Sequence, residues 1–321
     1  MLQLHYNWKV IEPILNFEKE VSGIELRGWL QNNPVAVPPE ILTAIRSKEV
    51  KPLSVATISF QYCPTRRDLY LSVKERLNGD QTWGRIAGKL AENFLSQLVL
   101  DHFNRKLSRR QRTYSGVRKV IERRLRKFIK ARRDDFELLN KYKTTPAGNP
   151  SFFGTTLRNA AIHELASQEL DFVLRATHER RTQPRETHLM PSEHLGLSRT
   201  TAPDFIFPDL RAVGDMKTGH DLEEYHLLTC AGYALAYESQ EKKPIDFGMV
   251  YFFSTHRSTV SFAQVYLFVI DDQLRNRFLL LRNSAYITVL EKNAPAFPDD
   301  KQRCPTCKYL RLCQSRGLQV T

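Results

Sequence analysis

Apolar residues recur at spacings of three and four in several stretches of this sequence, a pattern that predicts α-helices with one buried face. The predicted helices of this kind cover about residues 86–98, 117–129 and 154–176. Short apolar runs farther along the chain predict strands at residues 204–207, 212–216, 245–253 and 265–270. A helix over about 223–240 is predicted between the second and third of these runs. The order strand, strand, helix, strand is typical of an α/β domain.

Breaks in these patterns divide the chain into four predicted parts. Residues 1–60 are mixed in character and contain a proline-rich stretch, so we interpret them as an N-terminal extension. A cluster of helix-breaking residues near position 146 ends a helical and basic region that covers 61–150. The α/β core is predicted at 151–290, and a C-terminal cysteine-bearing segment at 291–321.

Composition and length favour a folded, water-soluble protein. The chain has 321 residues, of which 41% are hydrophobic and 26% charged, as is usual for globular proteins. No run approaches the roughly 18 apolar residues that a membrane span requires. The first residues do not combine a basic start with an apolar stretch, so no secretory signal is predicted. We therefore expect a cytoplasmic protein that does not contact membranes.

The charge balance indicates a polyanionic partner. The chain holds 48 Lys and Arg against 35 Asp and Glu, a net charge of +13. Residues 105–133 contain 14 Lys or Arg and one acid, so this segment alone accounts for the whole excess. Its apolar residues follow a helical period, which leaves a cationic face suited to a phosphate backbone. A merely solvated helix face is the alternative. The predicted DNA-binding residues on this face are Arg118, Arg123, Arg124, Lys127 and Lys130.

One pair of predicted strands carries candidate catalytic chemistry. Side chains two positions apart in a strand share a face, so Asp215 and Lys217 project together while Met216 turns into the core. Asp204 opens the preceding strand, and a hairpin would bring it close to Asp215. Two carboxylates suit Mg²⁺ or Mn²⁺, and a lysine can orient an attacking water or offset charge on phosphorus. The alternative is a surface Asp-Lys pair at the end of a hairpin.

The five cysteines are too few for a disulfide framework in a chain of this size. Cys304, Cys307 and Cys313 form a cluster that needs a fourth ligand, and Cys63 is the candidate. Four thiolates are the usual protein ligands of an iron–sulfur cluster, and they also suit structural zinc. Cys230 lies in an apolar helix and is predicted to be a buried core thiol.

The strand-and-helix region resembles the PD-(D/E)xK nuclease superfamily, and within it the RecB-like branch. Gly-Asp-Met-Lys-Thr-Gly at residues 214–219 matches the G-[E/D]-x-K-T-G motif of that branch throughout. In the following helix Tyr233 stands at the position of the family tyrosine. The glutamine four residues before it is replaced here by Thr229, which weakens the assignment of an amide contact to substrate.

The cysteine-bearing segments are similar to those of CRISPR-associated RecB-like exonucleases with four cysteines. Tyr-Cys-Pro-Thr-Arg-Arg-Asp-Leu-Tyr-Leu at residues 62–71, together with the C-terminal cysteine triplet, carries this resemblance. Most such proteins are shorter than this chain. Its helical insertion near residues 100–150 and its N-terminal extension resemble those of a longer, archaeal-type subgroup. The recognisable motifs cover about residues 53–76 and 185–316.

The resemblance implies a restriction-endonuclease-like fold: a central mixed sheet flanked by helices, with a helical insertion and a cysteine-liganded cluster region. It implies a [4Fe–4S] cluster held by Cys63, Cys304, Cys307 and Cys313. It also implies a Mg²⁺ or Mn²⁺ site formed by His163, Asp204 and Asp215, completed by Lys217 and Tyr233. The implied activity is a metal-dependent exonuclease that trims single-stranded DNA ends before they are integrated as CRISPR spacers, with CRISPR integrase proteins as partners.

Two alternatives stay open at this point. Many relatives carry their metal-site histidine shortly after the first cysteine, where this chain has Gly88 instead. If Gly88 is the equivalent position, His163 is an ordinary helix residue and the histidine has been lost. The protein would then be a catalytically weak or inactive DNA-binding subunit of the spacer-acquisition complex. A nuclease module of a repair helicase is a third possibility, although the chain has no phosphate-binding loop of its own.

Overall fold

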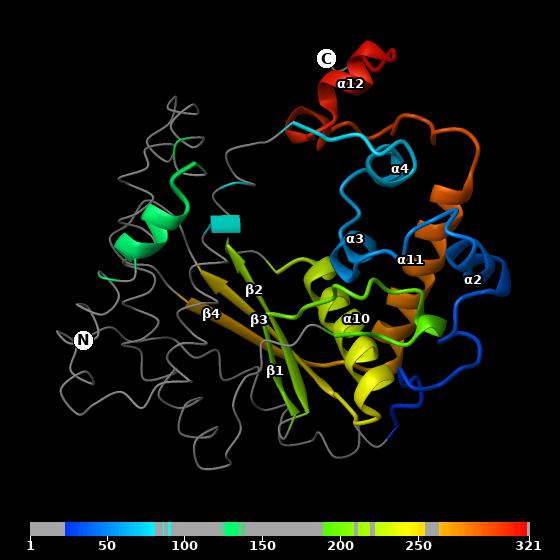
Figure 1. Ribbon diagram of the computed structural model, residues 1–321, viewed down its shortest axis with the longest axis vertical. Helices are drawn as coiled ribbons and strands as arrows, with labels where there is room; N and C mark the ends of the chain where they lie inside the picture. The colour runs from blue at the N-terminus through cyan, green and yellow to red at the C-terminus, as the bar shows by residue number, and fades with distance from the viewer. Residues whose placement is uncertain are drawn as a thin grey trace.

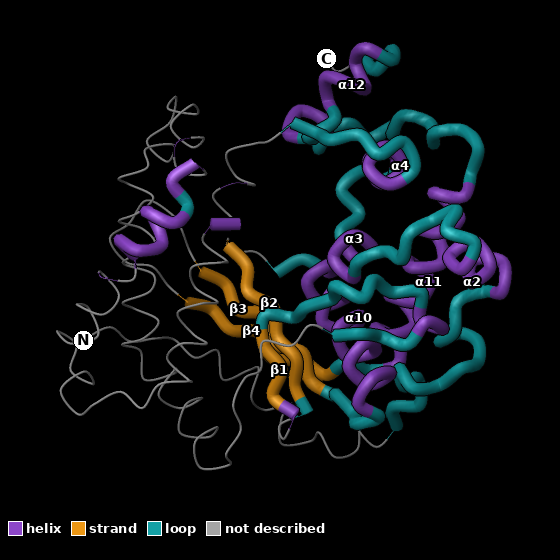
Figure 2. Tube along the Cα trace, in the orientation of Figure 1, coloured by secondary structure: helices purple, strands orange, loops and turns teal. Residues whose placement is uncertain are grey.

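The computed structural model describes residues 23–80, 86, 89–90, 123, 125–134, 137, 189–208, 211–218, 222–253 and 263–319. These residues form a sheet with helices packed beside it (Figures 1 and 2). The strands are β1 (Phe205–Phe207), β2 (Ala212–Thr218), β3 (Phe247–Phe253) and β4 (Ala263–Val269). The longer helices are α2 (Pro39–Arg46), α10 (Glu224–Glu241) and α11 (Asp272–Leu290). The shorter ones are α3 (Val55–Ser59), α4 (Arg67–Val73), η5 (Glu193–Leu195), η7 (Cys304–Thr306) and α12 (Leu310–Ser315).

The four strands form one mixed sheet in the order β1-β2-β3-β4. β1 and β2 are antiparallel, β2 and β3 are parallel, and β3 and β4 are antiparallel. A parallel pair needs a crossover connection, and α10 supplies it between β2 and β3. The α/β class, the strands and the helix predicted from the sequence are confirmed, and their ends differ from the predicted ones by only a few residues.

Helix α10 is the centre of the hydrophobic core. It packs against β2 and β3 on one side and against α3 and α11 on the other. Almost every residue from Leu228 to Ser239 is buried, because neighbours surround the helix on all sides. At Gly232 a Cβ atom would lie 2.6 Å from side-chain carbons of Phe278 and Val55. The absence of a side chain there lets α11 and α3 approach α10 closely.

Residues before position 60 contribute to this same core. Val35, Ile41, Val55 and Ile58 are almost fully buried and pack in one cluster with residues of α10 and α11. The boundary predicted at residue 60 stays a prediction. Within the described ranges, no helix is long and apolar enough to span a membrane.

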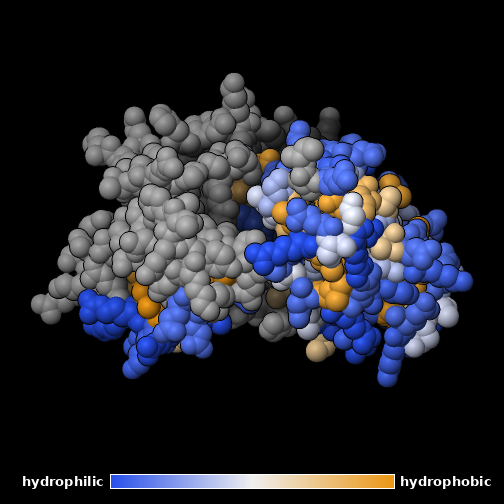
Figure 3. Space-filling view, turned by 90° about the horizontal axis from the view of Figure 1, so that it is seen from above, coloured by the Kyte–Doolittle hydropathy of each residue, from blue (hydrophilic) through white to orange (hydrophobic). Residues whose placement is uncertain are grey.

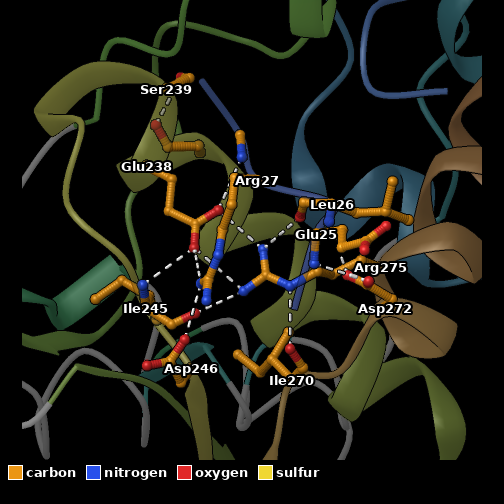
Figure 4. A network of polar contacts seen from close by, with 12 residues as sticks. Glu25, Leu26, Arg27, Glu238, Ser239, Ile245, Asp246, Ile270, Asp272 and Arg275 are labelled. Carbon is orange, nitrogen blue, oxygen red and sulfur yellow. Dashed lines mark hydrogen bonds and ion pairs between the residues drawn. The ribbon is translucent and has the colours of Figure 1, made fainter. Parts of the chain in front are cut away.

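A buried network of charged side chains joins the N-terminal segment to α10 and α11 (Figure 4). Glu238 of α10 has no exposed surface. Its carboxylate accepts hydrogen bonds from Arg27 Nη1 and Arg275 Nη1, both at 2.8 Å, and from the backbone N–H groups of Gly28 and Ile245 at 2.8 and 3.0 Å. A buried carboxylate with this many donors is compensated for the water it has lost.

Asp246 and further backbone groups complete the network. Arg27 Nη1 also lies 2.8 Å from Asp246 Oδ1, and Arg211 forms an ion pair with Asp246 Oδ2. Arg275 donates to the carbonyl oxygens of Leu26, Ile245 and Ile270. These contacts join the N-terminal segment to α10, to α11 and to the residues just before β3 (Figure 4).

Candidate functional site

Asp204, Asp215 and Lys217 come together where β1 begins beside the middle of β2. The register pairs Phe205 with Gly214, and one further step along both strands places Asp204 opposite Asp215. Asp204 Oδ2 accepts a hydrogen bond of 2.6 Å from the backbone N–H of Met216. Lys217 Nζ lies 2.7 Å from Asp215 Oδ2. The arrangement expected from strand alternation and a hairpin is therefore present.

The site combines a buried carboxylate with a partly exposed amine. The Asp215 side chain is 2% exposed and the Lys217 side chain 25% exposed. No described residue donates a well-directed hydrogen bond to Asp215 Oδ2, although Lys217 Nζ is close to it. A buried carboxylate beside a second carboxylate suits a hard divalent cation, which prefers oxygen ligands. Within the described ranges, no three His, Cys, Asp or Glu side chains converge as tightly as they would around a single bound ion.

The first turn of α10 adds two aromatic residues to the site. His226 is buried, and its ring packs edge-on against Phe252 with the centroids 5.0 Å apart. Phe252 is the neighbour of Lys217 in the parallel register of β2 and β3. The backbone N–H of Glu223 donates to His226 Nδ1 at 3.0 Å, so the neutral ring carries its proton on Nε2. Burial and the charge of Lys217 lower the pKa of His226 to about 4.

Tyr225 lies beside His226, with ring centroids 3.9 Å apart. Burial and the negative charge of Glu223 raise the pKa of Tyr225 to about 12. Both rings are therefore uncharged at neutral pH. Neither Tyr225 nor His226 was predicted from the sequence as a site residue. Their place could have been inferred from the order of elements. A crossover helix begins near the end of the strand that it follows, so the first residues of α10 lie near the end of β2.

The remaining α10 residues singled out from the sequence lie in the core. Tyr233 is 8% exposed and packs within the main hydrophobic cluster. Thr229 is buried, and its hydroxyl donates to the carbonyl oxygen of Tyr225 at 2.7 Å. Cys230 is completely buried, as predicted, and burial raises the pKa of its thiol well above the usual value.

A second site lies at the C-terminal end of the chain, where four cysteines line one pocket. Cys63 comes from the turn before α4, and the other three come from η7, the turn after it and α12. The pocket encloses about 430 Å³, part of it open to solvent. Figure 3 looks down on the molecule from the side on which α12 lies, and it shows exposed hydrophobic residues between hydrophilic ones. The structure thus brings together Cys63, Cys304, Cys307 and Cys313, all with free thiols.

Two segments that are far apart in the sequence hold this pocket in shape. Tyr62 donates through its hydroxyl to the carbonyl oxygen of Arg303 at 3.0 Å, and Thr65 donates to that of Ala296 at 2.8 Å. The Arg67 guanidinium lies 4.2 Å from the ring centre of Phe297. The hydroxyl of Tyr309 donates to the carbonyl oxygen of Leu77 at 3.0 Å, and the salt bridge between Glu75 and Arg316 at 2.7 Å closes the end of the segment.

Burial in the pocket favours the protonated thiols of Cys304, Cys307 and Cys313 when no metal is bound. Burial raises the pKa values of Cys304 and Cys313, and it raises that of Cys307 to about 11. The backbone N–H of Tyr309 lies 3.4 Å from Cys307 Sγ, and such N–H groups stabilise charge on a metal-bound sulfur. Binding of a metal centre would therefore release protons.

The basic helix is described in part. Residues 125–131 are helical, with Leu125 and Phe128 buried and Arg123, Lys127 and Lys130 exposed. The amphipathic pattern predicted for this segment is present over these residues. The other predicted residues of interest lie outside the described ranges: Gly88, Arg118, Arg124 and His163.

Comparisons with known proteins identify the family. A family model described as CRISPR-associated exonuclease Csa1 matches residues 1–316. A protein of Saccharolobus solfataricus named CRISPR-associated exonuclease Csa1 is 35% identical over 120 residues, which is 37% of this chain and 39% of that relative. The chain thus aligns with well under half of the relative's length. Because the family model covers almost the entire chain, this protein belongs to the CRISPR-associated exonuclease Csa1 family.

Proposed function

We propose that this chain is a divalent-metal-dependent deoxyribonuclease that removes nucleotides from single-stranded DNA ends during CRISPR spacer acquisition. The observation that carries the proposal is the convergence of Asp204, Asp215 and Lys217 at adjacent strands. The family description and the name of the Saccharolobus relative, which both include the word exonuclease, support it. The β1-β2-α10-β3-β4 unit would then be a restriction-endonuclease-like core.

The proposed chemistry divides the work between the carboxylates and the lysine. Asp204 and Asp215 would hold Mg²⁺ or Mn²⁺, which polarises a phosphodiester and lowers the pKa of a bound water. Lys217 Nζ would donate to the attacking water or to a non-bridging phosphate oxygen, where it offsets developing negative charge. In the hydrolysis the water oxygen would bond to phosphorus, the phosphorus bond to a sugar oxygen would break, and one proton from the water would end on that sugar oxygen. His226 and Phe252 would exclude water from the buried side of Lys217.

An exonuclease requires a free DNA end, and this requirement gives the direct test of the proposed function. Protein purified anaerobically should release nucleotides from linear single strands labelled at the 5′ or 3′ end when Mg²⁺ or Mn²⁺ is present. A circular single strand of the same sequence should persist, and a chelator should stop the reaction. DNA binding without hydrolysis of any strand, with either metal, would contradict the proposal and favour a non-catalytic DNA-binding subunit. This second candidate is favoured by Thr229, which replaces the family glutamine. Its buried hydroxyl donates to the carbonyl oxygen of Tyr225 and so is not directed at a substrate.

We also propose that the cysteine pocket holds a [4Fe–4S] cluster. The proposal is supported by the four free thiols that line one pocket and by the N–H group of Tyr309 beside Cys307 Sγ. The cluster would fasten the segment before α4 to the C-terminal segment.

Substitution of single cysteines tests this assignment. Anaerobically purified protein should be brown and contain about four iron atoms per chain. Cys63→Ser should lose most of the iron, whereas the matched control Cys230→Ser, outside the pocket, should retain it. A colourless protein with stoichiometric zinc would contradict the iron–sulfur assignment.

The basic helix is proposed to guide the DNA backbone. Replacing Arg123, Lys127 and Lys130 by glutamine should flatten the dependence of log affinity for single strands on log salt by about 0.7 for each phosphate that the helix no longer neutralises. Fluorescence anisotropy at several salt concentrations measures this slope. As a control with equal charge change, the exposed residues Lys48, Lys51 and Lys243 should be replaced in the same way. Equal slopes for the two triple variants would show that the helix is only a solvated face.

A further inference from the structure

A row of aromatic rings connects the protein surface to β3, the strand next to the one that carries Lys217. It begins at Phe60, directly after α3, whose ring centroid lies 4.7 Å from that of Tyr225 in an edge-on contact. The Tyr225 ring lies 3.9 Å from His226, and His226 lies 5.0 Å from Phe252, the register neighbour of Lys217. α3 packs against α10 (Figure 1), so the row crosses from one helix to the next.

The outer end of this row is open to solvent. Phe60 is 41% exposed and is the one aromatic side chain among the large, exposed hydrophobic residues in the described part of the chain. Tyr62 flanks it, with ring centroids 5.6 Å apart and planes inclined by 50°. Arg303, whose side chain is half exposed, is joined to the same surface because its carbonyl oxygen accepts the Tyr62 hydroxyl. The surface thus offers ring faces and edges beside an ion pair, because Arg303 Nη2 lies 3.4 Å from Glu223 Oε2.

We propose that Phe60, Tyr62 and Tyr225 form a stacking surface for the unpaired bases at the end of a DNA single strand. The inference rests on the proposed nuclease function, because it assigns the substrate path to the Asp-Lys site. Every base has a π-face, so aromatic stacking accepts any sequence, as a nuclease that removes successive nucleotides must. Bases within a duplex are already stacked on their neighbours, so this surface selects unpaired ends.

Charge argues for a nucleic acid strand as the occupant. The chain carries a net charge of +13, and the Arg303 guanidinium, which pairs with Glu223 at 3.4 Å and stays half exposed, stands beside the aromatic surface. Tyr225 is uncharged at neutral pH and so does not repel a phosphate. The row of rings continues through the buried His226 to Phe252, the register neighbour of Lys217, so packed side chains join the stacking surface to the strands of the Asp-Lys site.

Binding measured without hydrolysis tests the surface separately from catalysis. The probes are a short single strand and a blunt duplex of the same sequence, both in chelator. Phe60→Leu, which keeps an apolar side chain but removes the ring, should weaken single-strand binding by about five- to a hundred-fold. Phe60→Trp should preserve it, and duplex binding should change little in either variant. Leu280→Ala, at an exposed apolar position on α11, is the matched control and should bind like the unaltered protein.

A fluorescent base provides a second measurement that does not depend on any variant folding. A 2-aminopurine at the strand end should lose fluorescence on binding to the unaltered protein, because stacking quenches it. Unchanged fluorescence, or single-strand affinity that is equal in Phe60→Leu and the unaltered protein, would overturn the stacking surface while leaving the nuclease assignment intact. Conversely, weakened binding in Phe60→Leu alongside absent hydrolysis by the unaltered protein would leave the surface standing and remove the nuclease function.

Discussion

Replacing Asp215 by asparagine should reduce the rate of nucleotide release by about a thousand-fold or more, because loss of a metal-binding carboxylate removes most of the electrostatic stabilisation of the reaction. Asparagine has nearly the same shape as aspartate, so the buried site keeps its packing. The measurement is the initial rate of nucleotide release from an end-labelled single strand in Mn²⁺. Thermal unfolding and iron content should match those of the unaltered protein.

A second variant at this site and a control outside it complete the test. Lys217→Ala should also abolish most activity, but for a different reason, since Lys217 acts on the water or the phosphate and not on the metal. Glu40→Gln removes an exposed carboxylate in the first turn of α2 and should leave the rate unchanged. Undiminished hydrolysis in Asp215→Asn or Lys217→Ala would refute the assignment of the reacting groups.

Replacing Glu238 by glutamine should lower the free energy of unfolding by about 3–5 kcal/mol, the usual effect of breaking a buried ion pair. Arg27 and Arg275 would keep their charges while losing the carboxylate that both contact at 2.8 Å. Glutamine preserves the volume, so the change isolates the loss of charge. Urea unfolding followed by circular dichroism measures the effect.

The exposed pair of Arg46 and Glu193 is the matched control for this experiment. Its side chains are 61% and 46% exposed, and their nitrogen and oxygen atoms are also 2.8 Å apart. Glu193→Gln should leave the unfolding curve nearly unchanged, because solvent screens exposed ion pairs. If Glu238→Gln unfolded at the same urea concentration as Glu193→Gln, the buried network would not be a major source of stability.

Local sequence pattern was sufficient to predict the two strands that carry the candidate site. Strand alternation placed Asp215 and Lys217 on one face, and a short hairpin brought Asp204 alongside them. Both effects act within about 15 residues, so no long-range information was needed. The helix between the second and third strands was likewise predicted from local pattern, whereas its role as a crossover between parallel strands is seen only in the structure.

Contacts between distant segments could not be predicted from such patterns. The partners Arg27 and Glu238 are 211 positions apart, and nothing in the spacing of either residue indicates the other. Phe60 and Tyr225 likewise meet only because α3 packs against α10. The approach of Cys63 to the C-terminal cysteines was predicted for a different reason. Four thiolates suggest one metal centre, and the family resemblance indicated which four cysteines would be its ligands.

Binding of Mn²⁺ to the protein with its cysteine centre intact tests the central claim most directly, since it requires no DNA and no turnover. Free Mn²⁺, measured by its electron paramagnetic resonance signal during a titration, reports the occupancy of the site. The unaltered protein and Lys217→Ala should both bind Mn²⁺, whereas Asp204→Asn and Asp215→Asn should each lose most of the binding. Equal Mn²⁺ affinity in all four proteins would contradict a metal site at these two carboxylates.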